Sequence, residues 1–153
     1  MKNQERKVIS TNRKARHDYE LLDDYEAGLV LTGSEIKSIR AGRVNIRDGY
    51  VQPRDDELWL LNVHISTYEQ AGMFGHEPLR PRKLLMHRRE IDRIVASIQE
   101  KGLTVVPTKL YLVRGLAKVE IALARGKKKY DKRQDLRERE SKRQIERTLR
   151  ERY

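Results

Sequence analysis

The chain has 153 residues, enough for one domain of ordinary size with a segment left over. It contains no cysteine, which excludes disulfides, thiolate zinc sites and cysteine nucleophiles and is typical of a cytoplasmic protein. Its 34 Lys and Arg exceed its 23 Asp and Glu, and the formal net charge of +11 predicts attraction to polyanions. Charge alone leaves RNA, DNA and an anionic membrane surface as candidates.

The positive charge is concentrated at the two ends of the chain. Residues 1–16 hold six Lys/Arg and one acid, and residues 126–153 hold twelve Lys/Arg and six acids. Most apolar residues lie between these segments. We therefore predict a basic N-terminal arm over 1–15, a globular domain over 16–125 and a basic tail over 126–153. No apolar run resembles a signal peptide or approaches the roughly 20 residues that span a bilayer.

In chain order, period-2 patterns and β-branched runs predict strands at 18–22, 28–31, 49–53, 57–63, 103–113 and 117–123. Weaker patterns indicate short helices at 23–27 and 33–40, and Gly, His and Pro predict a loop over 72–81. Asp55-Asp56 and Arg114-Gly115 are expected to form tight turns. Pro107 lacks an amide donor, so its strand should lie at an edge or carry a bulge.

One helix is clear from its spacing. Ile91, Ile94, Val95 and Ile98 recur at helical intervals, and Gly102 follows as a terminator. One main helix and several short strands predict a mainly β fold, a small barrel with a basic C-terminal tail. The strand spacing suits a partly open barrel of the oligonucleotide-binding type, but it does not separate that fold from an SH3-like barrel.

Signals for catalysis are weak. None of the four histidines stands in a metal or catalytic motif, and no nucleophile elbow or phosphate loop is present. The acid pairs at residues 23–24 and 55–56 are typical of solvated turns and helix starts. We therefore expect no enzyme activity, no metal and no cofactor, and keep a two-metal nuclease as the enzymatic alternative.

Basic clusters are the stronger signal. They lie at residues 12–17, 80–83, 88–89 and 127–133, and the last embeds a tyrosine among cations, a combination that can grip phosphates and stack on a base. Any one of them could be a solvated loop. Together with the net charge they favour RNA or DNA binding. Membrane binding is disfavoured because no segment pairs its cations with a wide apolar face.

The tail has a different composition from the rest of the chain. From residue 130 to 153 only Leu136, Ile145 and Leu149 are aliphatic, too few to offset the entropy of ordering the segment. Its residues are good helix formers, and pairs such as Glu138 and Lys142 have the favourable i, i+4 orientation. We predict a marginal helix that forms on RNA.

Five blocks in order resemble the SsrA-binding protein family, also called small protein B or SmpB. The blocks are NRKARHDY at 12–19, EAGLVLTGSEIKSIRAG at 26–42, RKLLMHRREI at 82–91, TVVP at 104–107 and GKKKYDKR at 126–133. The resemblance covers nearly the whole chain from about residue 9 and implies an oligonucleotide-binding-type barrel with an extended tail.

The resemblance also implies a function. The chain would bind the tRNA-like half of transfer-messenger RNA (tmRNA), aid its alanylation by alanyl-tRNA synthetase, and carry it with elongation factor Tu to ribosomes stalled without a stop codon. The tail would enter the empty mRNA channel and reach the decoding centre of the small-subunit rRNA. No reaction would be catalysed. The alternative is a general structural RNA-binding protein of the ribosome.

Site residues follow from the same resemblance. The residues expected to meet the tRNA-like half are Asn12, Arg13, Lys14, Arg16, His17, Glu26, Lys37, Leu85, His87 and Lys118. Those expected at the decoding centre are Lys127, Lys128, Tyr130, Asp131, Lys132 and Arg133.

Three of these residues have features that bear on their expected roles. Glu26 is an acid that could accept hydrogen bonds from bases, and its alternative reading is a helix-surface acid paired with an arginine. His87 stands where many relatives are expected to carry Asn, and it is a poorer helix cap. Tyr130 stands where others carry His; both rings can stack.

Overall fold

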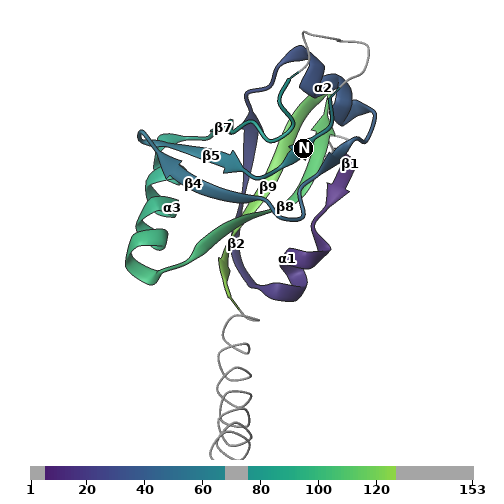
Figure 1. Cartoon of the computed structure of the whole chain (residues 1–153). Coiled ribbons are helices and arrows are strands. Elements are labelled where there is room, and N and C mark those ends of the chain that lie inside the picture. The colour runs from purple at the N-terminus through teal and green to yellow at the C-terminus, as the bar shows by residue number, and fades with distance from the viewer. Residues whose placement is uncertain (1–5, 68–75, 127–153) are drawn as a thin grey trace, which may run out of the picture.

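The computed structural model describes residues 6–67 and 76–126, and the fold is mainly β with one long helix (Figure 1). The elements are β1 Arg6–Thr11, α1 Arg13–Asp18, β2 Glu20–Leu29, α2 Gly33–Arg40, β3 Val44–Asn45, β4 Tyr50–Arg54, β5 Glu57–Leu61, β6 His64–Ile65, β7 Arg82–Leu85, α3 Arg88–Lys101, β8 Thr104–Val113 and β9 Leu116–Arg125. The predicted strands at residues 49–53, 57–63, 103–113 and 117–123 are confirmed.

The main sheet closes on itself. Its order is β1-β8-β4-β5-β7-β2-β9, and β8 also pairs with β9, so six strands form a ring with β1 attached outside it. β8 belongs to several pairings because its first half meets β4 at Val51↔Val105 and its second half meets β1. The register of β8 shifts between Pro107 and Lys109, which confirms the predicted bulge. The predicted barrel of the oligonucleotide-binding type is confirmed.

The folded unit begins earlier than the sequence indicated. Residues 6–11, expected in a basic arm, form β1 and pair with β8 from Arg6↔Val113 to Thr11↔Lys109. Residues 13–18 form α1, where a strand was predicted to start at residue 18. The described structure thus places residues 6–15 against the barrel, because β1 gains its hydrogen bonds from a strand about a hundred residues away.

The helix predicted at residues 23–27 is also wrong. These residues lie within β2, which pairs with β9 from Glu20↔Arg125 to Gly28↔Lys118. A register shift between Leu21 and Asp24 leaves Asp23 and Asp24 exposed. The pairing of β2 with β9 along most of its length overrides the weak helical pattern of these residues. The other two helices are confirmed: α2 covers the predicted range, and α3 ends at Gly102 with a left-handed φ of 64°.

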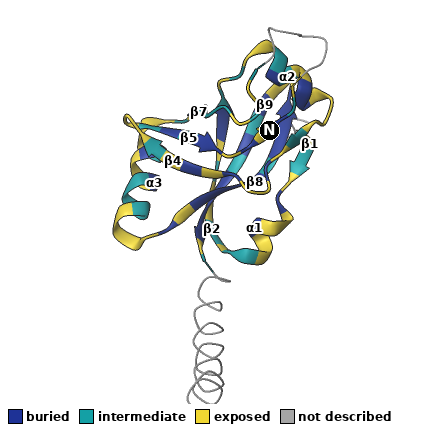
Figure 2. Cartoon of the chain, in the orientation of Figure 1, coloured by how far each residue is buried: buried dark blue, intermediate teal, exposed yellow. Residues whose placement is uncertain are grey.

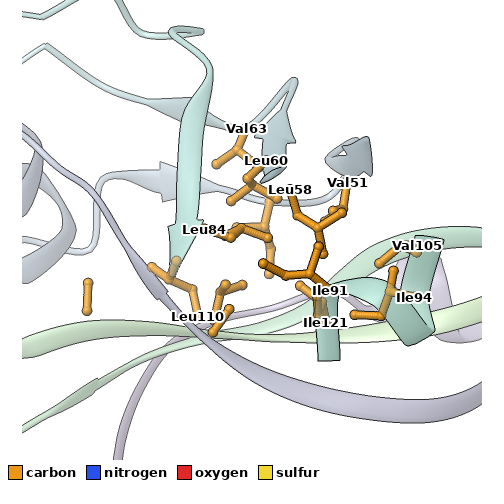
Figure 3. Close-up of a cluster of buried hydrophobic side chains, with 14 of the residues drawn as sticks. Val51, Leu58, Leu60, Val63, Leu84, Ile91, Ile94, Val105, Leu110 and Ile121 are labelled. Atoms are coloured by element: carbon orange, nitrogen blue, oxygen red, sulfur yellow. The ribbon is translucent and has the colours of Figure 1, made fainter. Parts of the chain in front are cut away.

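The core fills the ring (Figures 2 and 3). Inward-facing residues of β5, β7, β8 and β9 are buried, and α3 adds Ile91 and Ile94, which point into the same cluster as Leu58 and Ile121 (Figure 3). The core residues Leu58, Ile94, Leu110 and Ile121 are fully buried. Their alternation leaves the intervening residues of each strand on the outer face of the barrel.

Candidate nucleic-acid interface

One outer face of the barrel carries several of the predicted site residues. A row of directly paired residues crosses five strands: Leu85 of β7, Gly28 of β2, Lys118 of β9, Tyr111 of β8 and Val8 of β1. Directly opposed residues share one face of a sheet, and the core positions on the same strands face inward. Leu85 and Lys118 are therefore brought together on this surface, with Leu85 half exposed.

Glu26 lies two pairings along β2 from Gly28, and therefore on the same face, opposite Glu120. Its Oε2 accepts a hydrogen bond from the Tyr111 hydroxyl, and the Arg6 guanidinium lies 3.4 Å away. Arg6 also lies over the Tyr111 ring, 4.7 Å from its centre. Glu26 thus has an arginine partner, as the alternative interpretation of a paired surface acid expected, but it lies on a strand and not on a helix. Its side chain remains 44 % exposed.

Tyr111 is buried although it lies on the outer side of β8. Burial, followed by the hydrogen bond to Glu26, raises the pKa of its hydroxyl well above the usual range, so the phenol stays neutral and remains a donor. The sequence analysis missed Tyr111 and Arg6. A signal was present, because Tyr111 alternates with the core residues Leu110 and Leu112.

Helix α1 borders one end of this face and carries the densest group of predicted cations. Ala15 packs on Val106 and Ala124, which fixes the helix against β8 and β9. The exposed residues of α1 are Arg13, Lys14, Arg16 and His17. Lys14 Nζ lies 2.7 Å from Asp48, and this bond raises the pKa of Lys14. His17 Nδ1 lies 3.1 Å from Asp18.

Asn12 differs from its neighbours because it is 1 % exposed. Its Oδ1 accepts from the amide of Ala15 and caps α1, while its Nδ2 donates to the carbonyls of Ile46 (3.2 Å) and Pro107 (2.8 Å). In this structure Asn12 therefore has a structural role, because it orients the helix that carries the cations. Its contact with RNA stays a prediction.

Helix α2 borders the other end of the face (Figure 1). Lys37 lies on its exposed side about one turn before Arg40. The Arg40 guanidinium donates to Gly115 in the turn between β8 and β9, at 3.3 Å. Arg40 therefore links α2 to the turn between β8 and β9, and Lys37 lies about one turn earlier on the same helix.

A buried ion cluster, missed by the sequence analysis, holds α2 in place. Glu35 is fully buried, and its carboxylate binds Arg80 at 2.6 Å, the Thr32 amide at 2.8 Å and Arg82 at 2.7 Å. Arg82 is itself 1 % exposed and donates to the carbonyl of Val63 at 2.6 Å. Burial opposes ionisation of Glu35, but the hydrogen bonds outweigh it and lower its pKa to about 2.

His87 begins α3 just beyond Leu85. Its side chain makes no capping hydrogen bond, as expected for a poor cap, while its carbonyl accepts from Glu90 and Ile91. A shallow hollow lined by His87, Arg89, Glu90 and Arg93 lies at this end of the helix. The first turn of α3 therefore offers uncapped amides and cations, which together favour an anion.

Nine of the predicted positions lie on the outer side of β2, β7 and β9, on α1, on α2 or at the start of α3, and we call these positions together the basic face. Its members are Arg13, Lys14, Arg16, His17, Glu26, Lys37, Leu85, His87 and Lys118. The tail positions Lys127, Lys128, Tyr130, Asp131, Lys132 and Arg133 lie outside the described residues. The basic face can hold phosphates through its cations and can offer Glu26 to hydrogen-bond donors on bases.

Within residues 6–67 and 76–126, no group of three or more His, Asp or Glu is placed to hold a metal ion. No helix in these ranges is both long and apolar enough to cross a bilayer.

A closed barrel of the oligonucleotide-binding type with one basic outer face defines a class of nucleic-acid-binding barrel proteins. A family model described as "SmpB protein" matches residues 9–151. The chain belongs to the SmpB family.

Relatives and a solved structure agree with this assignment. "SsrA-binding protein" of Roseiflexus sp. (strain RS-1) is 62 % identical over 147 residues, covering 95 % of this chain and 93 % of the relative. "SsrA-binding protein" of Carboxydothermus hydrogenoformans is 57 % identical over 147 residues, covering 96 % and 99 %. A solved structure described as "tmRNA-SmpB: a journey to the center of the bacterial ribosome" is 48 % identical, with a TM-score of 0.66, covering 78 % of this chain and 84 % of that one.

Proposed function

We propose that this chain binds tmRNA and acts with it on the ribosome in trans-translation. The observation that carries the proposal is the membership of the whole barrel and most of the tail in the SmpB family, whose relatives are named for binding SsrA, the tmRNA. The basic face supports the proposal, because cations at both ends of a strand surface can contact the phosphates of two separate backbone segments of a folded RNA.

The finer assignment concerns which part of the chain meets which RNA. The basic face binds the tRNA-like half of tmRNA, and its cations grip phosphates while Glu26 reads a base. The tail, with Tyr130 to Arg133, enters the empty mRNA channel and reports to the decoding centre. The chain helps alanyl-tRNA synthetase and elongation factor Tu act on the RNA, works in the cytoplasm and catalyses no reaction itself.

Glu26→Ala is the sharpest test of the basic face. The variant should weaken binding to the isolated tRNA-like RNA by about 1–3 kcal/mol, because a base donor loses its charged acceptor. Filter binding at fixed salt measures the effect, with an ordinary tRNA as competitor. An unchanged affinity would return Glu26 to a purely structural role.

The alternative, a general structural RNA-binding protein of the ribosome, makes a different prediction. Sequencing of the RNA that is recovered with the purified chain should show one dominant species if tmRNA is the partner. A profile dominated by ribosomal RNA, without enrichment of tmRNA, favours the alternative.

A further inference from the structure

Two carboxylates face each other on the basic face. Glu26 of β2 is paired directly with Glu120 of β9. Like charges in this position destabilise a sheet unless each has its own partner. Strand β8 supplies both partners: the Tyr111 hydroxyl donates to Oε2 of Glu26, and the Thr108 hydroxyl donates to Oε2 of Glu120 at 2.5 Å. Each carboxylate is therefore held by a different hydroxyl.

The hold on Glu26 is strongly oriented. Tyr111 is 1 % exposed, so neighbouring residues fix the position of its hydroxyl. Arg6 lies over the Tyr111 ring and approaches Oε2 of Glu26, the same oxygen that Tyr111 binds. Within residues 6–67 and 76–126, Oε1 of Glu26 accepts no hydrogen bond from the protein. An ionised carboxylate has lone pairs on both oxygens, so Oε1 remains an acceptor.

We propose that Tyr111 is a positioning residue that, with Arg6, holds Oε2 of Glu26 and directs Oε1 toward an amino or imino N–H of an RNA base. This inference rests on the proposed function, in which the basic face binds the tRNA-like half of tmRNA. A base donor is the fitting ligand because a carboxylate repels phosphate and accepts from N–H groups.

The protonation state of the phenol suits this role. Burial and the bond to Glu26 raise the pKa of Tyr111, so it donates throughout the neutral range. An exposed glutamate without such a donor would populate several rotamers and would lose that freedom on binding RNA. Tyr111 pre-organises the acceptor before the RNA arrives.

Tyr111→Phe tests the proposal because it keeps the ring, its burial and the Arg6 contact and removes only the hydroxyl. The affinity of the full chain for the tRNA-like RNA should fall about tenfold. Thr108→Val is the matched control, because it removes the hydrogen bonds of the Thr108 hydroxyl to Glu120 and keeps the hydrogen bonds to Oε2 of Glu26. Its affinity should stay within about twofold of wild type.

Two further measurements separate positioning from a general loss of structure. In a Glu26→Ala background, Tyr111→Phe should cause no additional loss, since the group it positions is absent. The dependence of binding on salt should keep its slope in Tyr111→Phe, because no phosphate contact is removed. Equal losses in Tyr111→Phe and Thr108→Val, or a Tyr111→Phe loss that adds fully to that of Glu26→Ala, overturn the proposal.

The outcomes also separate this inference from the function on which it rests. A wild-type chain that fails to prefer the tRNA-like RNA over ordinary tRNA overturns both. A wild-type chain that binds selectively, with a Tyr111→Phe variant that binds equally well, overturns the inference alone. If Tyr111→Phe unfolds in urea earlier than wild type, Arg6→Gln serves as a second variant, because it loosens the same carboxylate from an exposed position. The loss of RNA affinity in Arg6→Gln should likewise vanish in the Glu26→Ala background.

Discussion

Asn12 and Arg13 are adjacent in the sequence, but one acts on the fold and the other is placed to act on RNA. Asn12→Ala removes the cap of α1 and leaves the carbonyls of Ile46 and Pro107 without their donor. The free energy of unfolding should fall by about 2–3 kcal/mol. Urea denaturation at neutral pH measures the loss.

Arg13→Ala is the matched control for that prediction. Arg13 is exposed, so its removal should change the free energy of unfolding by no more than about 0.5 kcal/mol. It should instead weaken RNA binding and reduce the salt slope by about one. The division between the two residues is wrong if Arg13→Ala destabilises the fold as much as Asn12→Ala does.

The contrast between these residues marks the limit of sequence reasoning at a single position. Both stand in one basic block that resembles an RNA-binding motif, and the resemblance assigned both to RNA. The burial of Asn12 depends on the carbonyl of Pro107, 95 positions away, and on a bulge in β8. Glu26 lies partly exposed on β2, but its partners Tyr111 and Arg6 come from strands that meet only in the closed sheet.

At the scale of elements, the ion cluster around Glu35 joins α2 to β7 and predicts a pH dependence of stability. The pKa of Glu35 is about 2 in the folded chain, against an ordinary value of 4.5. Because the folded pKa is the lower one, its stabilisation is fully present above about pH 4.5 and is lost as the pH falls toward 2. The shift corresponds to about 3 kcal/mol.

Urea denaturation between neutral pH and pH 2 measures this loss, and Glu35→Gln should lack it. At neutral pH the same variant should lower the free energy of unfolding by about 3–5 kcal/mol, because Arg82 keeps a buried charge without its partner. Glu20→Gln breaks the exposed pair with Arg125 and serves as control. A wild-type chain and a Glu35→Gln chain with parallel pH profiles would contradict the role given to Glu35.

Elements with a local pattern, weaker for α2 and clear for α3, were predictable, and those that depend on distant pairing were not. Thr32 and Glu35 form a capping box that starts α2, and Gly102 ends α3, so both helices could be inferred from neighbouring residues. β1, β7 and the middle of β2 have no comparable local pattern. Their hydrogen-bond partners lie on β8, β5 and β9, which are too distant in the sequence to fall in the same short window.

At the scale of the whole molecule, we expect the barrel to fold without residues 127–153. All buried core residues of the described chain lie between Asn12 and Ala124. Removal of residues 127–153 should therefore change the free energy of unfolding by no more than about 0.5 kcal/mol and should spare most affinity for the tRNA-like RNA. It should abolish tagging on stalled ribosomes.

Urea denaturation, filter binding and a tagging assay on truncated message measure these three outcomes. Persistent tagging after the truncation would contradict the division of labour between barrel and tail.

The fold class was predictable because alternation and turn residues reveal strands and their approximate number. Closure of the ring was not, because it depends on contacts such as Val51↔Val105 between segments without a shared motif.

The pairing of β1 outside the ring has a consequence for how the molecule behaves in concentrated solution. A closed ring has no free edge, so β1 is the strand of the main sheet at which a second copy could add by hydrogen bonding. Its register shifts between Val8 and Ser10, and Arg6 and Lys7 place two cations at its start. An irregular, positively charged edge repels its own copy, so the chain should resist self-association through extended strands.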